Sequence, residues 1–548
     1  MPADLIVVNA RLRAIFAPEG TTSLAVAEGR ILALGTDEAM RAHAGPATRI
    51  IDAKGCELMP GFVESHLHLF MGGATLAMLN LGSVFGFDAC RDALLAFAAA
   101  TPGEEILFGY AINYVIFGED RRPDRHILDA IIADRPLCLL STDLHCAWAN
   151  TLALELAGIL HGADVGPESE VVMGSDGLAT GELREFAAMN RVKMLSRLKG
   201  RDGMDYEAGA VSDEERAHDK GLIRKAGDYC AENGITTAVN MDGNAYQAGL
   251  MAELARAGEM KVRVSLPLRL DQSHGPSGIA RIDDFGPEIP GWLHFGRIKL
   301  FMDGVYDTWT ALTVSDYPDR PGFRSEALIA PDIFNAMCIE ADRRGLQIAT
   351  HAVGDGAVRA AIDGYEAARN ANGARDARHR IEHIDTITPE DLDRLLPLGI
   401  VASMQPVHPP GSAGLPLEPT TTIMGRDRWP TAFPWRMILN RDVPLAFGTD
   451  WPVSPISPLY AIHCALTRKT WAADMPDQRL DLDDCLLAYT AGGAHADFAE
   501  DRRGRLAPGF DADLVLIDGS LEGLAQQPDA ARIAMTICNG TITFDGTR

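Results

Sequence analysis

The chain has 548 residues, of which 47% are hydrophobic and 23% are charged, an ordinary globular composition that argues against a disordered or fibrous protein. Its 50 basic and 76 acidic side chains give a formal net charge of −26. Because a surface this acidic repels phosphate backbones and anionic lipid, we expect no nucleic acid and no membrane among its partners.

The cysteines and the first residues indicate where the protein works. The nine cysteines are scattered and form no CxxC pair, which excludes a disulfide scaffold and a zinc ribbon. Residues 1–16 lack a basic region followed by a long apolar core, so they do not resemble a signal peptide. The uncharged stretch 69–87 contains four glycines and is interpreted as a buried loop or cavity wall, not as a membrane span. We therefore expect a cytoplasmic protein.

Both ends of the chain contain short strand-like segments separated by Gly, Asn and Asp. These segments are residues 4–12, 23–35 and 48–61 near the start, and residues 504–519 and 531–546 near the end. Neither end could bury both faces of a sheet alone. We therefore predict one composite β-sandwich built from residues 1–58 and 501–548.

Between the two ends, apolar strand candidates alternate with helical segments. The eight strand candidates are residues 57–69, 235–242, 261–268, 297–304, 346–355, 379–385, 399–406 and 443–450. Near-continuous apolar strands are typical of a buried parallel sheet, and this number predicts an α/β fold with a (β/α)8 TIM barrel over residues 59–500. About 165 residues separate the first two strands, far more than an ordinary connection, and predict a subdomain inserted over residues 75–210 that covers the active site.

Side chains that bind metals stand at the ends of five of these strands. His66 and His68 are two residues apart, so on a strand they point the same way. The later strands carry Lys299, His351, His383 and Asp450. Each has an ordinary alternative, such as a core histidine, a snorkelling lysine or a helix-capping aspartate. Together they lie where (β/α)8 enzymes build their active sites, and imidazole, carboxylate and carbamylated amine groups suit zinc or a similar divalent ion.

With these motifs the chain resembles the amidohydrolase superfamily of metal-dependent hydrolases. More narrowly it resembles the amidohydrolase-3 (YtcJ-like) branch, which includes N-substituted formamide deformylases. The motifs that carry the resemblance run over nearly the whole chain: PGFVESHLHL, IKLFMDG, THAVGDGAV, RIEHID, SMQPVH, FGTDWPVSPISPL and GRLAPGFDADLVLID. The bulky segment 305–309 departs from the family pattern, so no relative's substrate is carried over.

The resemblance implies a metal site and a reaction. The metal shell would consist of His66, His68, Lys299, His351, His383 and Asp450 around one or two divalent ions, zinc being the first expectation. In binuclear members the lysine is N-carboxylated and bridges two ions. The implied reaction is the hydrolysis of a C–N bond, an amide such as an N-formyl or N-acyl group, in a small molecule. The sequence leaves open whether the protein forms a homo-oligomer.

Further side chains are assigned to catalysis and substrate binding. Asp450 would accept the proton of the attacking water and deliver it to the leaving nitrogen. His145 would donate to the developing oxyanion, with a structural histidine as the alternative. An apolar substrate pocket would be lined by Tyr114, Trp148, Tyr306, Trp309 and Trp451, although aromatic residues in a chain of this length can equally form core.

Three alternatives stay open at this point. A mononuclear deaminase on the same barrel would need a catalytic glutamate near the fifth and sixth strands, which the sequence does not identify. An esterase or carbamate hydrolase would use the same metals. A non-catalytic scaffold would be expected to have lost ligands, and none of the six is lost.

Overall fold

In a computed structural model, the protein is described over residues 2–103, 105–118, 121–142, 145–166, 169–203 and 209–547. The chain divides into two compact units. Unit 1 consists of Met1–Leu69, Gly227–Trp451 and Pro455–Arg548, and unit 2 consists of Phe70–Ala226 and Pro452–Ser454. Unit 2 therefore contains most of the long segment between the first two predicted barrel strands.

Unit 1 contains a ring of parallel strands. Their order is β6 (Phe62–Leu67), β13 (Ile235–Asn240), β14 (Arg263–Ser265) with β15 (Leu268–Arg269), β17 (Arg297–Phe301), β18 (Gln347–Ala352), β19 (Arg380–His383), β20 (Val401–Met404) and β21 (Leu445–Phe447). The break between β14 and β15 contains Pro267, which has no N–H to donate to a ladder. A parallel bridge between Leu67 and Trp451 joins the last strand to the first. The predicted (β/α)8 fold is confirmed.

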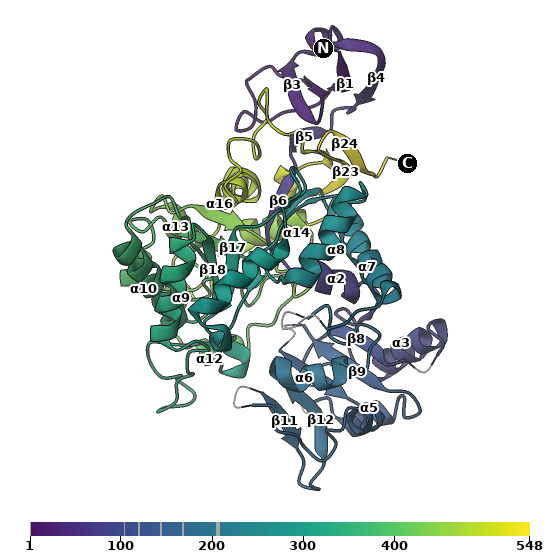
Figure 1. Ribbon diagram of the computed structural model, residues 1–548, viewed down its shortest axis with the longest axis vertical. Coiled ribbons are helices and arrows are strands. Elements are labelled where there is room, and N and C mark those ends of the chain that lie inside the picture. The colour runs from purple at the N-terminus through teal and green to yellow at the C-terminus, as the bar shows by residue number, and fades with distance from the viewer. Residues whose placement is uncertain are drawn as a thin grey trace. The chain divides into compact units, whose positions relative to one another are not determined.

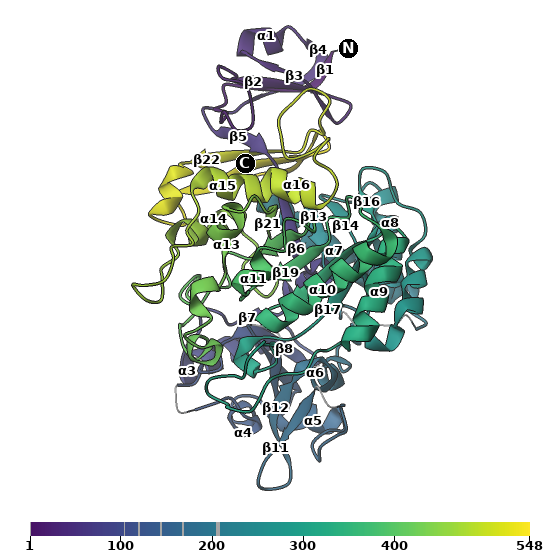
Figure 2. The ribbon, with the colours of Figure 1, turned by 90° about the vertical axis from the view of Figure 1, so that its left-hand side faces the viewer.

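Helices cover the outside of the ring. Figure 2 shows α9 (Pro331–Arg343) and α10 (Asp355–Asn372) side by side, and both pack against β18. Gly364 allows this close approach, because a Cβ at that position would collide with the ring of Phe334 on α9. Four of the strands (β6, β13, β18 and β19) are buried over their whole length, as expected of a parallel sheet covered on both faces.

Two four-stranded sheets complete unit 1. One has the order β3 (Arg30–Gly35), β2 (Ser23–Ala27), β1 (Ala3–Val8), β4 (Ala44–Asp52), and the other has the order β24 (Thr541–Asp545), β23 (Ala531–Cys538), β22 (Leu514–Gly519), β5 (Glu57–Pro60). In the second sheet, β5 pairs antiparallel with β22, with Pro60 opposite Leu514. Figure 1 shows this sheet with its yellow strands from the end of the chain beside β5. Strands from near both termini therefore share one sheet.

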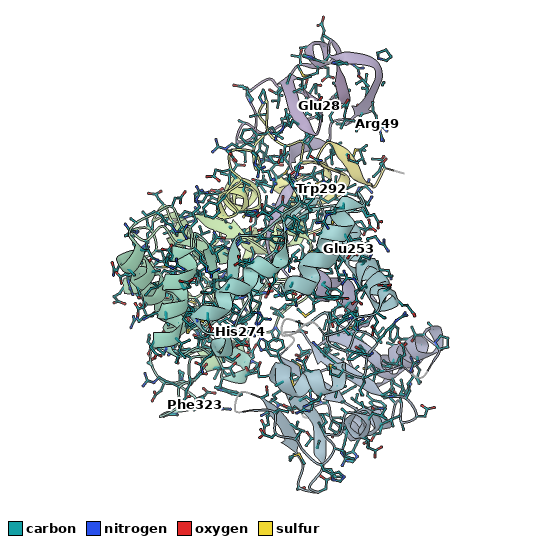
Figure 3. All side chains as sticks on the ribbon, in the orientation of Figure 1. Glu28, Arg49, Glu253, His274, Trp292 and Phe323 are labelled. Carbon is teal, nitrogen blue, oxygen red and sulfur yellow. The ribbon has the colours of Figure 1, made fainter. Side chains whose placement is uncertain are left out.

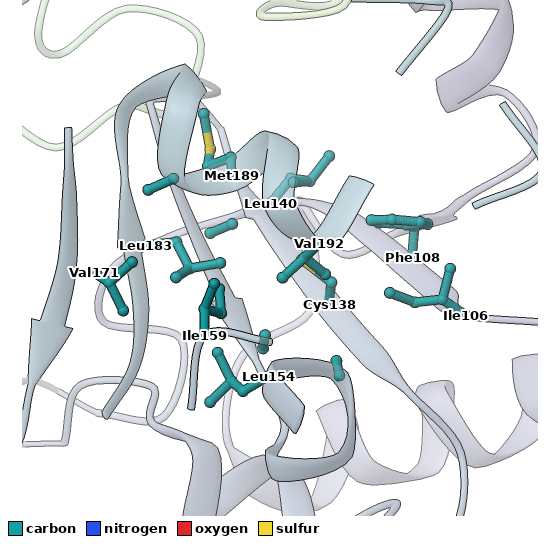
Figure 4. Packing of buried hydrophobic residues seen from close by; sticks show 14 of the residues in the cluster. Ile106, Phe108, Cys138, Leu140, Leu154, Ile159, Val171, Leu183, Met189 and Val192 are labelled. Carbon is teal, nitrogen blue, oxygen red and sulfur yellow. The ribbon is translucent and has the colours of Figure 1, made fainter. Parts of the chain in front are cut away.

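Unit 2 is built on a six-stranded sheet. Its order is β11 (Glu170–Met173), β12 (Ala179–Arg184), β10 (Cys146–Ala149), β9 (Leu137–Ser141), β8 (Leu107–Ile112) and β7 (Leu79–Asn80). Alternate side chains of the central strands fall into two different hydrophobic clusters, as the two-residue period of a strand requires. Figure 4 shows one of them, in which Cys138 and Leu140 of β9 pack against Met189 and Val192 of α6 (Glu185–Lys193).

The helices of unit 2 include α2 (Leu69–Thr75), which begins in unit 1, α3 (Phe87–Ala100) and α7 (Asp213–Glu232), which runs on into unit 1. Along the described parts of the chain, no helix combines the length and the apolar character that crossing a membrane requires.

Candidate metal centre

Two histidines and one aspartate converge at the seam where β21 meets β6. His66 lies near the end of β6, and His68 follows one residue after that strand. The Nε2 atoms of His66 and His68 lie 3.3 Å and 3.2 Å from Asp450 Oδ1. All three side chains are buried, and their donor atoms lie close enough together to hold one metal ion. Among the described residues, His66 Nε2 and Asp450 Oδ1 have no hydrogen-bond partner.

A second group of donors shares Asp450. His383 at the end of β19 and His408 after β20 join Asp450 with their ligand atoms within 4.8 Å of one another. His408 Nε2 lies 3.8 Å from Asp450 Oδ2, and the His408 ring is stacked on the His383 ring with centroids 5.8 Å apart. The ring of His351, from β18, lies 4.4 Å from the ring of His383. Asp450 thus stands between two groups of imidazoles.

The imidazoles are held in position through their other ring nitrogen. His66 Nδ1–H donates to Glu382 Oε2 at 2.7 Å, and His68 Nδ1–H donates to Asp242 Oδ1 at 2.9 Å. His383 Nδ1–H donates to Gln405 Oε1 at 3.0 Å. Such partners fix the tautomer and the direction of a metal-binding histidine. In each case Nε2 is the nitrogen left for a ligand.

The backbone is strained where two of these side chains leave their strands. His383 has a φ of 78° and Asp450 a φ of 61°, in the left-handed region that residues other than glycine rarely adopt. Each such conformation costs roughly 1–3 kcal/mol and is typical of functional sites. Asp450 is not a helix cap, because the next helix, α14 (Pro458–Thr467), is capped by Ser457. The capping alternative for Asp450 is therefore wrong.

Lys299 lies in the middle of β17 and is fully buried. Its Nζ has no hydrogen-bond partner among the described residues and lies 4.4 Å from the centre of the Phe301 ring. Burial lowers the pKa of Lys299 to about 8, although the nearby carboxylates Glu382 and Asp450 oppose this shift. An amine in this state is poorly suited to remain a simple structural cation.

The charges within the site follow from burial and proximity. Burial opposes ionisation of Asp450, but His66 and His68 hold the pKa of this carboxyl well below its usual range. Burial likewise opposes the charge of His68, yet Asp242 and Asp450 raise the pKa of His68 to about 9. Burial lowers the pKa of His408 to about 4. At neutral pH the site therefore offers a carboxylate, a neutral imidazole at His408 and, at His68, an imidazole that binds a metal only after losing a proton.

The donor set fits a divalent metal ion. Neutral imidazoles and carboxylates are the ligands of zinc and related ions. Four buried side-chain atoms have no hydrogen-bond partner among the described residues, as expected of atoms that bind an ion. They belong to His66, Asp450, His408 and Lys299.

Three predicted site residues belong to unit 2. His145 Nδ1–H donates to Glu185 Oε2 at 2.8 Å, and the His145 ring lies 5.6 Å from that of Phe186. Tyr114 and Trp148 pack edge to face with centroids 5.3 Å apart. Trp148 is fully buried in one of the two hydrophobic clusters of unit 2.

Two predicted substrate-binding residues lie on the segment after β17. Tyr306 is buried, and its hydroxyl lies 2.6 Å from the hydroxyl of Thr386. Trp309 Nε1–H donates to Asp319, and the guanidinium of Arg320 lies 3.5 Å from the centre of the indole ring. Figure 3 labels Phe323, an exposed residue farther along this loop.

Of the predicted aromatic residues, Trp451 lies next to the candidate metal ligands His68 and Asp450. Its carbonyl accepts the backbone N–H of His68 at 2.8 Å, and Asp450 precedes it in the chain. Its ring is buried and lies 5.6 Å from the ring of Tyr229.

Sequence reasoning missed three residues of this centre: Asp242, Glu382 and His408. Like the predicted ligands, each is a charged or imidazole side chain that lies within a buried barrel strand or a few residues after one. Glu382 stands directly before His383, and Asp242 lies two residues after β13. Their position near the ends of the predicted strands is the sequence signal that identifies them.

Comparison with known proteins places the chain among hydrolases. The sequence profile of the amidohydrolase family matches residues 49–544. The Arabidopsis thaliana protein LONG AFTER FAR-RED 3 is 30% identical over 540 residues, covering 94% of this chain and 87% of that protein. N-substituted formamide deformylase from Arthrobacter pascens is 27% identical over 537 residues, covering 94% and 93% of the two chains.

A solved structure shares the fold. The crystal structure of an uncharacterized metal-dependent hydrolase from Pyrococcus horikoshii superposes with a TM-score of 0.74 at 23% identity, covering 96% of this chain and 99% of that one.

Proposed function

The chain belongs to the amidohydrolase family, and we propose that it is a metal-dependent hydrolase that cleaves a C–N bond, an amide such as an N-formyl or N-acyl group, in a small molecule. The relative from Arthrobacter pascens, a formamide deformylase similar over nearly the whole chain, supports an amide as the substrate.

One observation carries the proposal. The Nε2 atoms of His66 and His68 both point to Asp450 Oδ1, at 3.3 Å and 3.2 Å, while their Nδ1 atoms are held by buried carboxylates. A purely structural histidine pair would not need three ligand atoms, His66 Nε2, His68 Nε2 and Asp450 Oδ1, to converge on one point. This arrangement is typical of a metal site with oriented ligands.

Six side chains would hold one or two divalent ions, zinc being our first expectation: His66, His68, Lys299, His351, His383 and Asp450. When bound, such an ion lowers the pKa of water and polarises a carbonyl group. Asp450 stays ionised, so its Oδ2 can accept a proton from the attacking water and return it to the leaving nitrogen. His408, neutral and 3.8 Å from Oδ2, is placed to orient that carboxylate or the substrate.

We also propose that Lys299 is N-carboxylated. The neutral amine attacks carbon dioxide, forming an N–C bond and releasing one proton, and the product is an anion. This change removes a buried amine without a hydrogen-bond partner and supplies a carboxylate ligand in its place. A 13C NMR signal of the carbamate after growth or incubation with labelled bicarbonate, absent in Lys299→Met, would support the modification.

The deaminase alternative is disfavoured by Glu382. This glutamate stands directly before His383 on the sixth strand, but its Oε2 accepts from His66 and its Oε1 accepts from Arg380 Nε at 2.8 Å. With both oxygens engaged by buried cationic or imidazole donors, Glu382 positions His66 and has no oxygen left to shuttle protons to a substrate. These engaged oxygens support amide hydrolysis assisted by Asp450 over deamination assisted by Glu382.

The test combines metal analysis with a substrate panel. The purified protein is assayed for bound divalent metal and for turnover of N-formyl, N-acetyl and N-acyl-amino-acid amides, with esters and carbamates of the same acyl groups and exocyclic-amine compounds as alternatives. Neutral or cationic amides come first, because the net charge of −26 disfavours the capture of anions.

We expect metal in the protein and amide hydrolysis that falls by about 10²–10⁴-fold in Asp450→Asn. Asp501→Asn, which removes a carboxylate whose side chain is 78% exposed, is the matched control and should leave turnover unchanged. Metal-loaded protein that hydrolyses only esters, or Asp450→Asn with normal turnover, would contradict the proposal.

A further inference from the structure

Unit 2 contains a pocket of about 210 Å³ that shares no residue with the candidate metal centre. It lies where the end of α2, helix α3, strand β8 and helix α7 surround the end of α6. Its apolar walls include Met78, Phe97, Phe108, Leu198 and Leu222. The volume is below the roughly 300–1,000 Å³ of pockets for drug-sized ligands, so the pocket suits a smaller molecule.

A buried cation lines this apolar pocket. Lys193, the last residue of α6, is only 9% exposed. Within the described parts of the chain, its ammonium forms neither a hydrogen bond nor an ion pair, although Glu105 and Asp202 also line the pocket. A lysine near a helix C-terminus gains some energy from the helix dipole, but this gain is normally realised with the ammonium in water. The stem of Lys193 is mostly buried, and its charge at the pocket wall is left available to an anion.

The charge of Lys193 lies near the hydrophobic cluster of unit 2 that contains Cys138. Its neighbour Val192 packs against Cys138 in the hydrophobic cluster, as Figure 4 shows. Burial raises the pKa of the Cys138 thiol to about 12, and the nearby ammonium of Lys193 acts in the opposite direction. The charge is therefore felt at a buried side chain.

A second cation on the pocket wall, Arg135, forms no ion pair with a carboxylate of the described residues. Arg135 Nε–H donates to the Glu105 carbonyl at 2.7 Å, and Nη1–H donates to the Thr101 carbonyl. These neutral acceptors fix the guanidinium without cancelling its charge. The remaining cationic groups are compensated: Arg197 pairs with Glu214, and His218 lies 3.1 Å from a carboxylate oxygen.

We propose that this pocket binds a small organic carboxylate with an apolar, aromatic or branched body. Lys193 holds the carboxylate, Arg135 adds positive potential, and the body of the ligand lies against Phe97 and Phe108. Charge-assisted hydrogen bonds to a carboxylate satisfy a buried ammonium, and the apolar walls select against inorganic anions. The pocket is thus a second ligand site, and it does not depend on the function proposed for the metal centre.

The test measures the binding of benzoate to the purified full-length protein by calorimetric titration and by ligand-observed NMR. Benzyl alcohol serves as the uncharged probe and inorganic phosphate as the anion without an apolar body. We expect saturable binding of benzoate, with affinity lowered at least about tenfold in Lys193→Met and retained in part in Lys193→Arg. Binding of benzyl alcohol should be weak and equal in all variants.

Two further variants make the result specific. Lys199→Met removes an exposed lysine that pairs with Glu215 in the same unit, and should leave benzoate binding unchanged. His68→Ala disables the metal centre and should also leave it unchanged. The proposal is overturned if wild-type protein shows no saturable benzoate binding, if Lys193→Met and Lys193→Arg both bind like wild type, if phosphate binds as well as benzoate, or if binding is lost only in His68→Ala. Melting curves of each variant show that the comparison is made on folded protein.

Discussion

Replacing Asp242 by Asn tests whether the metal centre depends on residues beyond its ligands. Asp242 is fully buried, and its Oδ1 accepts from His68 Nδ1 at 2.9 Å while its Oδ2 accepts from Gln247 at 3.0 Å. Asparagine has nearly the same size, and its carbonyl can still accept one of these hydrogen bonds. The substitution therefore removes a negative charge from behind His68 with little change in shape.

The size of the effect can be bounded. Asp242 and Asp450 together raise the pKa of His68 from 6.5 to about 9, which corresponds to roughly 3 kcal/mol of preference for positive charge on this ring. Asp242 contributes only part of that preference. The negative charge of Asp242 that favours a proton on His68 also favours a metal cation bound to His68. We expect the affinity for a divalent ion to fall by about 10–100-fold, or roughly 1.4–2.7 kcal/mol.

Competition with a fluorescent chelator at fixed pH measures this affinity directly. Asp219→Asn is the matched control, because Asp219 is also a fully buried carboxylate, but it pairs with Arg201 in unit 2. The control should lose thermal stability and keep its metal affinity. If Asp242→Asn binds metal as tightly as wild type, the support that we assign to Asp242 through His68 does not exist.

The remaining predictions concern stability and charge. Lys299→Met should abolish turnover. In protein freed of metal and carbon dioxide it should leave the denaturation midpoint unchanged or higher, because there it replaces a buried amine, without a hydrogen-bond partner among the described residues, by a thioether of similar size. Loss of stability would contradict this. Trp148→Ala should lower the free energy of unfolding by about 3–5 kcal/mol, seen as a lower midpoint in denaturant, because the indole is fully buried in a hydrophobic cluster. A raised KM in a variant of undiminished stability would instead support a role in substrate binding. Asp342→Asn should be less stable than wild type at pH 7, and the difference in midpoint should shrink as pH falls below about 4. Burial opposes ionisation of Asp342, but hydrogen bonds from His379 and Arg375 hold the pKa of this carboxyl below its usual value of 3.8. The ionised carboxylate therefore stabilises the fold fully above pH 3.8, and this stabilisation is lost in acid. A difference that persists unchanged at low pH would exclude this assignment.

The barrel was predictable because burial on both faces leaves a clear trace in a sequence. Strands such as β18 are buried over their whole length, so β18 appears as a short, largely apolar segment with His351 near its end. The ends of parallel strands meet at one edge, which is why the pattern also predicted that His66, His383 and Asp450 lie together.

Other features depend on contacts that no local pattern reveals. His408 lies beyond the end of β20, and its distance of 3.8 Å from Asp450 depends on the path of the loop. Trp148 is a predicted residue of the substrate pocket. The pairing of β10 with β9 and β12 determines on which face of the sheet its ring lies. For Asp450, a helix cap and a metal ligand have the same sequence signature, and only the absence of a helix directly after it separates them.

The pairing of β5 with β22 has a consequence for how the chain folds during its synthesis. The sheet that holds residues 57–60 is complete only when residues 514–545 have been made, and the barrel can close only after residue 451. In unit 2, in contrast, the strands and the buried residues of both hydrophobic clusters precede residue 226, and only Pro452–Ser454 come later. At about 5–20 residues per second, the ribosome needs roughly 15–60 s to make the intervening 319 residues (545 − 226). During that time unit 2 can fold. The first barrel strand, β6, still lacks one of its neighbours, and its apolar side chains are exposed. A chaperone that binds nascent chains would therefore act on unit 1 first.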